Sequence, residues 1–265
     1  MKMATSTLEH PKVVSRAEWL AARRALLAKE KEITRASDEL ARQRRQLPWM
    51  KIEKSYVFDT PRGKETLSDL FGGRSQLIIA HFMFGPGWKE GCVGCSFGAD
   101  HVDGMLVHLS NHDVSYASVS RAPIDEIEAF KQRMGWRFKW VSSFNNDFNY
   151  DYNVSFTKED AAKGKVFYNY DLQDFVSEEL SGLSVFYKDE AGDIFHTYSC
   201  YARGDEKRLT TYMLLDITPK GRNENGPNYS LADWVRHHDR YGADGHVDST
   251  GRYRESKVEG CCHEK

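Results

Sequence analysis

The chain has 265 residues, of which 40% are hydrophobic and 29% are charged, and its formal net charge is −2. This near-neutral balance argues against a strongly basic nucleic-acid-binding domain, and no apolar run approaches the ~20 residues that span a membrane. The first residues lack the apolar core of a secretory signal, so we expect a cytoplasmic protein without a membrane partner.

The first predicted element is a long helix. Ser15 and Glu18 have the spacing of a capping box, and the helical pattern continues to about Leu47, just before a proline. Leucine or isoleucine recurs every seven residues from Leu26 onward, which permits a homodimer, but polar residues fill the second heptad row. We therefore expect residues 1–52 to form a helical extension that docks on the main domain.

The central part of the chain alternates strands and helices. The apolar run 77–84 predicts a central strand covered on both faces. After it we expect a helix over 97–109, a strand over 114–119, a helix over 123–134, a hairpin from 183–187 and 194–198, and a helix over 231–241. Strand–helix–strand alternation gives a parallel pair with a right-handed crossover, so the predicted class is α/β, with a mixed sheet flanked by helices.

Two cysteines, Cys92 and Cys95, stand between the predicted central strand and the helix after it. At a helix N-terminus, unsatisfied backbone N–H groups and the helix dipole favour a thiolate. The thiolate is the attacking species in disulfide exchange, and the second cysteine is close enough in sequence to close a small ring with the first. The order of strand, turn, cysteine pair and helix therefore predicts a redox-active dithiol.

Residues 82–97, followed by Ala99-Asp100-His101, are similar to DUF899, a family of bacterial and fungal thioredoxin-like proteins. Supporting segments are 118–123, 148–151, 196–199 and 233–241. The resemblance implies a thioredoxin-like domain over residues 53–241 and a dithiol–disulfide oxidoreductase. In dithiol enzymes of this fold the N-terminal cysteine is the more exposed, which implies that Cys92 attacks and Cys95 resolves. Unlike thioredoxins, this chain has no proline directly before the predicted hairpin.

An aromatic-rich segment, residues 136–156, shows little helical or strand period. It is either a packed loop that closes a sheet edge or an aromatic wall beside the dithiol. In the second interpretation Phe148 and Tyr150 contact the substrate, together with Trp88 from the turn before the dithiol. The substrate is then a protein disulfide or a small-molecule disulfide.

The last segment, residues 242–265, is polar and contains glycine, so we expect a mobile tail. It carries Cys261 and Cys262, which are predicted auxiliary thiols. These cysteines either pass electrons to Cys92 and Cys95, bind a metal, or have no role.

Two other functions compete with disulfide exchange. A peroxiredoxin-like peroxidase needs a proline seven positions before its cysteine and a threonine between them; here Pro86 is six positions before Cys92, and Lys89 takes the threonine place. A Cys/His metal-binding protein needs further ligands beside Cys92 and Cys95, and His81, His101 and His196 could supply them only through the fold. Without a dinucleotide or P-loop fingerprint we expect no cofactor, so electrons come from an external thiol or a reductase.

Overall fold

The computed structural model describes residues 11–228 and 230–256, which belong to an N-terminal unit up to Trp49 and a larger unit from Met50 onward. In the first unit, α1 (Arg16–Arg44) begins at Ser15 with the expected capping box, in which Glu18 N–H donates to Ser15 Oγ over 3.3 Å. None of the residues of α1 is buried. Its docking on the main domain and a homodimer stay predictions.

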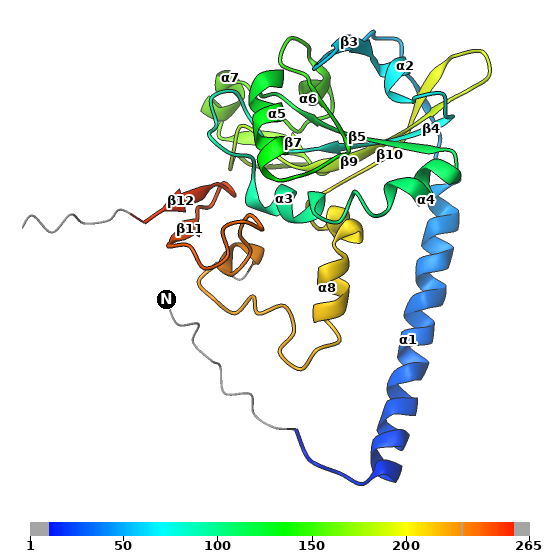
Figure 1. The fold of residues 1–265 in the computed structure, drawn as a ribbon. Coiled ribbons are helices and arrows are strands. Elements are labelled where there is room, and N and C mark those ends of the chain that lie inside the picture. The colour runs from blue at the N-terminus through cyan, green and yellow to red at the C-terminus, as the bar shows by residue number, and fades with distance from the viewer. Residues whose placement is uncertain (1–10, 229, 257–265) are drawn as a thin grey trace, which may run out of the picture. The chain divides into compact units, whose positions relative to one another are not determined.

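The larger unit is built on an eight-stranded sheet among the described residues, in the order β1-β10-β9-β4-β5-β6-β2-β3 (Figure 1). The strands are β1 (Met50–Lys51), β2 (Val57–Thr60), β3 (Gly63–Thr66), β4 (Gln76–His81), β5 (Val114–Ser120), β6 (Lys139–Ser142), β9 (Gly182–Lys188) and β10 (Ile194–Tyr201). Strand β4 pairs parallel with β5 and antiparallel with β9, and β9 pairs antiparallel with β10.

This strand arrangement confirms the predicted thioredoxin-like fold. A helical crossover joins the parallel pair β4 and β5, and the hairpin β9–β10 adds to the free side of β4. The central strand is shorter than predicted, because β4 ends at His81 rather than at residue 84 and the backbone of Met83 turns away from its neighbouring strands. Backbone groups of Met83 then bond to Cys92 and Cys95 instead of to a neighbouring strand, which places the end of β4 beside the dithiol.

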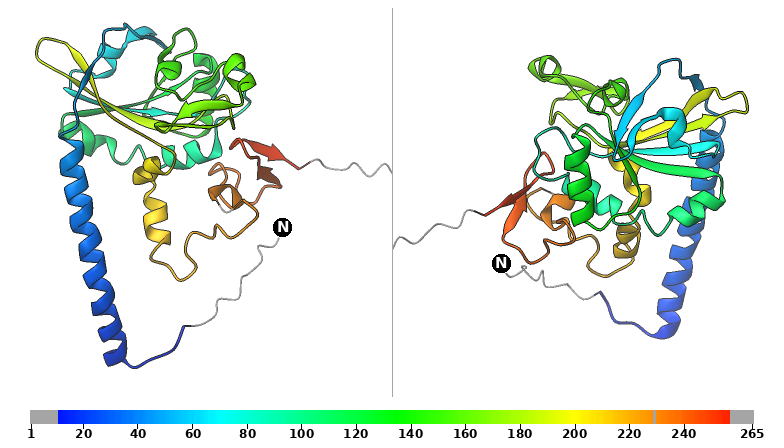
Figure 2. Two further views of the ribbon diagram at one scale, coloured as in Figure 1. Left: turned by 180° about the vertical axis from the view of Figure 1, so that it is seen from behind. Right: turned by 45° about the horizontal axis from the view of Figure 1, so that its top comes forward.

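Helices cover both faces of the sheet (Figures 1 and 2). One face packs against α3 (Val93–Ala99), α4 (Leu106–Asn111) and α5 (Ile124–Arg133), and the other against α2 (Leu67–Leu70) and α6 (Phe148–Asp151). Along β4, Leu77 and Ile79 pack with Phe148 on one side, while Ala80 packs with Phe130 on the other. The prediction that both faces of this strand are buried is therefore confirmed.

The remaining elements are not part of the eight-stranded sheet. They are α7 (Lys158–Ala162), β7 (Lys165–Tyr168), β8 (Asp171–Asp174), the 3-10 helix η1 (Ala202–Arg208), α8 (Thr210–Leu215), the 3-10 helix η2 (Leu231–Asp233), β11 (Gly245–Val247) and β12 (Tyr253–Glu255). Val166 and Tyr168 of β7 nevertheless pack into the core of the sheet. Among the described residues no helix has both the length and the apolar composition of a membrane span.

Two predicted helices are wrong in extent. The helix over 97–109 is divided into α3 and α4 by a turn, because Asp103 leaves the helix to accept the N–H groups of Arg137 at 2.9 Å and Phe138 at 3.0 Å. The helix over 231–241 is reduced to η2, because the next residues bond to other elements, such as Asp239 to Arg133 at 2.7 Å. In both places tertiary hydrogen bonds override a local helical pattern.

The two segments with the least regular sequence are both structured. Residues 136–156 contain β6 and α6, and Trp140 and Phe148 are fully buried, so this region is part of the core. Residues 245–255, inside the predicted tail, form the β11–β12 hairpin. Cys261 and Cys262 lie outside the described residues.

Candidate functional site

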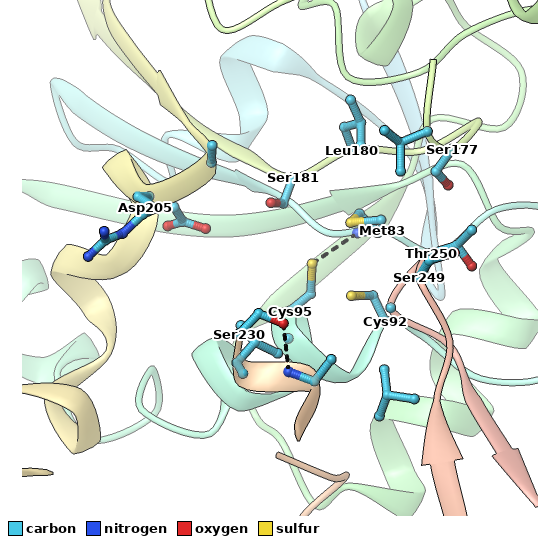
Figure 3. Close-up of a pocket in the computed structure, with 18 of the residues that line it drawn as sticks. Met83, Cys92, Cys95, Ser177, Leu180, Ser181, Asp205, Ser230, Ser249 and Thr250 are labelled. Carbon is cyan, nitrogen blue, oxygen red and sulfur yellow. Dashed lines mark hydrogen bonds between the residues drawn. The ribbon is translucent and has the colours of Figure 1, made fainter. Parts of the chain in front are cut away.

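Cys92 and Cys95 lie at the start of α3, with Cys92 as the residue before the first helical turn. The Cys92 N–H donates to the Met83 carbonyl over 2.9 Å, and the Met83 N–H donates to Cys95 Sγ over 3.4 Å. These bonds tie the start of the helix to the chain that leaves β4. Both cysteines are free thiols, and their sulfur atoms point into a common cavity (Figure 3).

The cavity has a volume of about 550 Å³. Besides the start of α3, it is lined by residues 176–181, by residues of η1 and α8, and by residues of the segment 228–251. Ser181, which precedes β9 where thioredoxins place a proline, is part of this lining. Cys92 is 5% exposed and Cys95 is 3% exposed, so both thiols are buried and Cys92 is only slightly the more exposed of the two. The thiols are reached through the cavity.

The two thiols have opposite pKa shifts. The hydrogen bond from the Cys95 thiol, helped by the N–H groups of Cys95 and Gly94, lowers the pKa of Cys92 to about 7 against the opposing effect of burial. The same hydrogen bond, together with burial, raises the pKa of Cys95 well above its ordinary value. Near neutral pH Cys92 is therefore partly ionised while Cys95 keeps its proton, the protonation states that an attacking and a resolving thiol require.

A partly buried cluster of ionisable side chains lies next to Cys92. His237 is fully buried, its Nε2 donates to the Gly91 carbonyl at 2.9 Å, and His237 is one of the groups that lower the pKa of Cys92. Glu90 lies 3.3 Å from His237 and 2.6 Å from both Arg133 and Arg240. The close contact with His237 and the two guanidinium groups lower the pKa of Glu90 to about 2. The negative charge of Glu90 is therefore balanced locally, which limits its effect on the thiolate.

Arg208 is a site residue that the sequence did not indicate. It forms a buried ion pair with Asp205 at 2.6 Å and lines the cavity. Its Nη1 atom packs over Gly98 on α3, where an added Cβ would lie 2.6 Å from it. The positive charge of Arg208 opposes the rise in the pKa of Cys95. The spacing of Asp205 and Arg208 is visible in the sequence, but only the fold brings them to the dithiol.

The β11–β12 hairpin was also missed as part of the site. Gly251, in the turn of this hairpin, accepts a hydrogen bond from the Val93 N–H over 2.9 Å and so caps the start of α3. Its φ is +80°, and an added Cβ would lie 2.7 Å from Cys92 Sγ. Position 251 therefore favours glycine for two separate reasons, backbone conformation and contact with the sulfur.

The three predicted substrate-contact residues do not line the cavity. Trp88 is buried beside it, with the Arg252 guanidinium 4.4 Å from its ring centroid. Phe148 lies in the core, and Tyr150 lies under Arg121 at 4.9 Å. The structure therefore brings Cys92 and Cys95 together but places Phe148 and Tyr150 in other surroundings.

The histidines considered as metal ligands are engaged elsewhere. His81 is buried in β4, where its Nε2 bonds to Ser184 Oγ at 2.8 Å and burial lowers its pKa to about 3. His101 bonds to the Phe97 carbonyl and to Thr211, both at 2.7 Å. Within the described ranges no group of three or more His, Cys, Asp or Glu side chains is arranged to hold a metal ion.

A family model described as "Bacterial protein of unknown function (DUF899)" matches residues 8–241. The chain belongs to the DUF899 family. A search of curated proteins found no match for this DUF899 chain. Among solved structures it is similar to a peroxidoxin, BcpB, from Mycobacterium tuberculosis, with 13% identity, a TM-score of 0.39, and coverage of 62% of this chain and 95% of that one.

Two further solved structures are similar to the DUF899 chain at the same level. One is described as a "putative Thiol:disulfide interchange protein DsbE" from Chlorobium tepidum, with 14% identity, a TM-score of 0.37, and coverage of 63% of this chain and 96% of that one. The other is a 2-Cys peroxiredoxin from Plasmodium vivax, with 14% identity, a TM-score of 0.36, and coverage of 59% and 82%. The fold assignment itself depends on the strand order described above.

Proposed function

We propose that this DUF899 chain is a thiol–disulfide oxidoreductase in which Cys92 attacks and Cys95 resolves. The observation that supports it is the opposite pKa shift of two thiols that line one cavity. The Cys92 thiolate attacks one sulfur of a substrate disulfide, the substrate S–S bond breaks, and the first thiolate leaves and takes a proton. Cys95 then loses its proton and attacks Cys92 Sγ, which releases the second thiol and leaves a Cys92–Cys95 disulfide.

Neighbouring groups support the second step of this proposal. The Met83 N–H already donates to Cys95 Sγ, and the charge of Arg208 favours the thiolate form of Cys95. Both stabilise the negative charge that develops on Cys95 when it attacks the mixed disulfide. The substrate has then been reduced to two thiols and the enzyme oxidised, so an external thiol or a reductase must return the Cys92–Cys95 disulfide to the dithiol.

The pH dependence of alkylation tests the assignment of the nucleophile. We expect the rate of Cys92 alkylation by iodoacetamide to be half-maximal near pH 7, because the thiolate alone reacts and the Cys92 pKa is lowered to about 7. Below that pH the rate falls about tenfold per unit as the thiolate is protonated. The measurement is a quenched time course at each pH, followed by mass spectrometry of the peptide that contains both cysteines.

The same peptide carries the control. Cys95 is expected to stay unmodified over the pH range in which Cys92 reacts, because its pKa is raised. A free peptide thiol reacts with a midpoint of about 8.5. Alkylation of Cys92 with that ordinary midpoint, or equal labelling of both cysteines near pH 7, would contradict the proposal.

A further inference from the structure

The hairpin β11–β12 covers Cys92, the proposed attacking thiol, and several contacts hold it in place. Asp248 fixes its turn by accepting the N–H groups of Thr250 at 2.9 Å and of Arg252 at 3.1 Å. Arg252 stacks on Trp88 at 4.4 Å, and Val247 is 5% exposed, in a cluster with Val93. The hairpin is therefore held at both ends of its turn, with Gly251 against Cys92.

This hairpin limits the size of what can reach the sulfur. At position 251 even one added methyl carbon would lie 2.7 Å from Cys92 Sγ. A disulfide in a folded protein brings two backbone segments with it, and these need open space around the sulfur that is attacked. The cavity volume of about 550 Å³ instead lies within the range of roughly 300–1,000 Å³ that is typical of small-molecule sites.

The charges of the cavity wall are already balanced. The charged side chains that line it are paired as Arg208 with Asp205 at 2.6 Å, Arg203 with Glu206 at 2.8 Å, and Asp248 with Arg254 at 2.8 Å. Each charged side chain of the described lining has an opposite partner, and the buried Nη1 of Arg208, which has no hydrogen-bond partner, packs over Gly98 of α3. A carboxylate that entered the cavity would lose water without gaining a free cation, which is costly.

The rest of the lining suits an uncharged ligand. Around the thiols it presents apolar side chains such as Met83 and Leu180, and hydroxyl groups such as those of Ser181 and Thr250 (Figure 3). Apolar walls with a few hydroxyl groups are typical of sites for neutral, largely apolar small molecules.

We infer that the cavity takes an uncharged, largely apolar small-molecule disulfide, and that the β11–β12 hairpin excludes protein disulfides. This inference rests on the proposed function and names its substrate class. The reaction is the one given above: the enzyme dithiol becomes the Cys92–Cys95 disulfide, and the small disulfide becomes two thiols. An external small thiol then reduces the enzyme again.

Three disulfides of different charge and size test the inference. They are dithiodipyridine, which is neutral and small, dithiobis(nitrobenzoate), which is small but carries two carboxylates, and insulin, whose disulfides belong to a folded protein. Formation of the Cys92–Cys95 disulfide is followed by acid quench and mass spectrometry of that peptide. Each rate constant is divided by that of free dithiothreitol with the same disulfide, which removes differences in intrinsic reactivity.

We expect the normalised rate constant for dithiodipyridine to exceed those for dithiobis(nitrobenzoate) and for insulin by at least about tenfold each, because an unpaired buried carboxylate is costly and the hairpin blocks a protein. Equal normalised rates for the three disulfides would overturn the inference but leave the proposed function intact. If none of the three produced a Cys92–Cys95 disulfide, the proposed function itself would fail.

A matched pair of glycine variants tests the hairpin. Gly251→Ala and Gly242→Ala both place alanine at a positive φ, +80° and +91°, but only the Cβ at position 251 meets Cys92 Sγ; nothing lies within 4 Å of the one at 242. In Gly251→Ala the methyl group either crowds the small disulfide or displaces the hairpin and admits insulin. Both changes lower the ratio of the dithiodipyridine rate to the insulin rate, by about tenfold or more, which corresponds to about 1.4 kcal/mol.

Gly242→Ala is expected to keep the wild-type ratio. A ratio that is unchanged in Gly251→Ala, or that falls equally in both variants, would show that the hairpin does not select the substrate. Thermal unfolding of both variants measures the loss of stability that the strained backbone causes, which we expect to be comparable in the two.

Discussion

Replacing Cys92 with serine is expected to reduce disulfide exchange with dithiodipyridine at the dithiol by at least about a thousandfold, or roughly 4 kcal/mol of transition-state free energy. The hydroxyl group of serine is not ionised near pH 7, whereas the Cys92 thiolate is half-populated there. Cys95 cannot replace Cys92 as the nucleophile, because the raised pKa of Cys95 keeps its thiol protonated. The measurement is thiopyridone release under steady-state reduction by dithiothreitol.

The Cys95→Ser variant is expected to behave differently. The serine hydroxyl can still donate a hydrogen bond to Cys92, so the first attack continues, but the mixed disulfide has no internal thiol to resolve it. Intact-protein mass spectrometry should show one substrate thiol attached at Cys92, released only by added reductant. A variant that forms no such adduct while wild-type activity persists would rule out the proposed order of steps.

Two sets of control variants complete this experiment. Cys200 is buried in β10, and its Sγ bonds to the Gly204 carbonyl at 3.4 Å, so Cys200→Ser is expected to keep the wild-type exchange rate. A chain with Cys261→Ser and Cys262→Ser separates exchange at the auxiliary thiols from exchange at Cys92. If that chain turned over substrate at the wild-type rate, the predicted relay through the C-terminal thiols would be unnecessary.

The local chemistry of the dithiol could be predicted from sequence because it depends on neighbours in the chain. An apolar strand, a glycine-containing turn, two cysteines and a helix lie within residues 77–99, and the structure places them in that order around Cys92 and Cys95. The strand–helix alternation predicted the parallel pair for the same reason. Hydrophobic periodicity reports which face of an element is buried, and the burial on both sides of β4 agrees with it.

The cavity could not be predicted, because its walls come from segments far apart in the chain. Residues 176–181, 202–212 and 228–251 meet only after folding, and each is polar or irregular in sequence. The aromatic segment was ambiguous for a related reason. Phe148 and Tyr150 are equally consistent with a substrate wall and with a core, and only the fold shows Phe148 at 0% exposure. Sequence shows which residues are apolar, but not which other segments they meet.

Tyr150 belongs instead to a buried ion-pair cluster, which should dominate the stability of this region. The Arg121 guanidinium lies 2.5 Å from the Glu179 carboxylate, and Ser155 Oγ donates to the same carboxylate over 2.6 Å. The side chain of Glu179 is only 1% exposed. Burial raises the pKa of Glu179, while Arg121 acts in the opposite direction. Without Arg121, the ionised carboxylate of Glu179 would be buried with no opposite charge beside it.

We expect Arg121→Met to lower the free energy of unfolding by about 3–5 kcal/mol at neutral pH, because it leaves a buried carboxylate without its partner. The surface pair of Arg137 with Asp103, in which the Arg137 side chain is 81% exposed, provides the control. Arg137→Met should cost less than about 1 kcal/mol. Denaturant unfolding of the three proteins measures both differences.

The pH dependence of the Arg121→Met deficit identifies Glu179 as its source. A carboxyl whose pKa is raised in the folded state binds a proton more tightly there than in the unfolded chain, so its unfavourable contribution grows as the pH rises above the unfolded value and is absent below it. Without Arg121 the pKa of Glu179 rises further, and the difference from wild type should shrink as the pH is lowered from 8 toward 5. A deficit of equal size at every pH would assign the loss to packing against Tyr150 rather than to the buried charge.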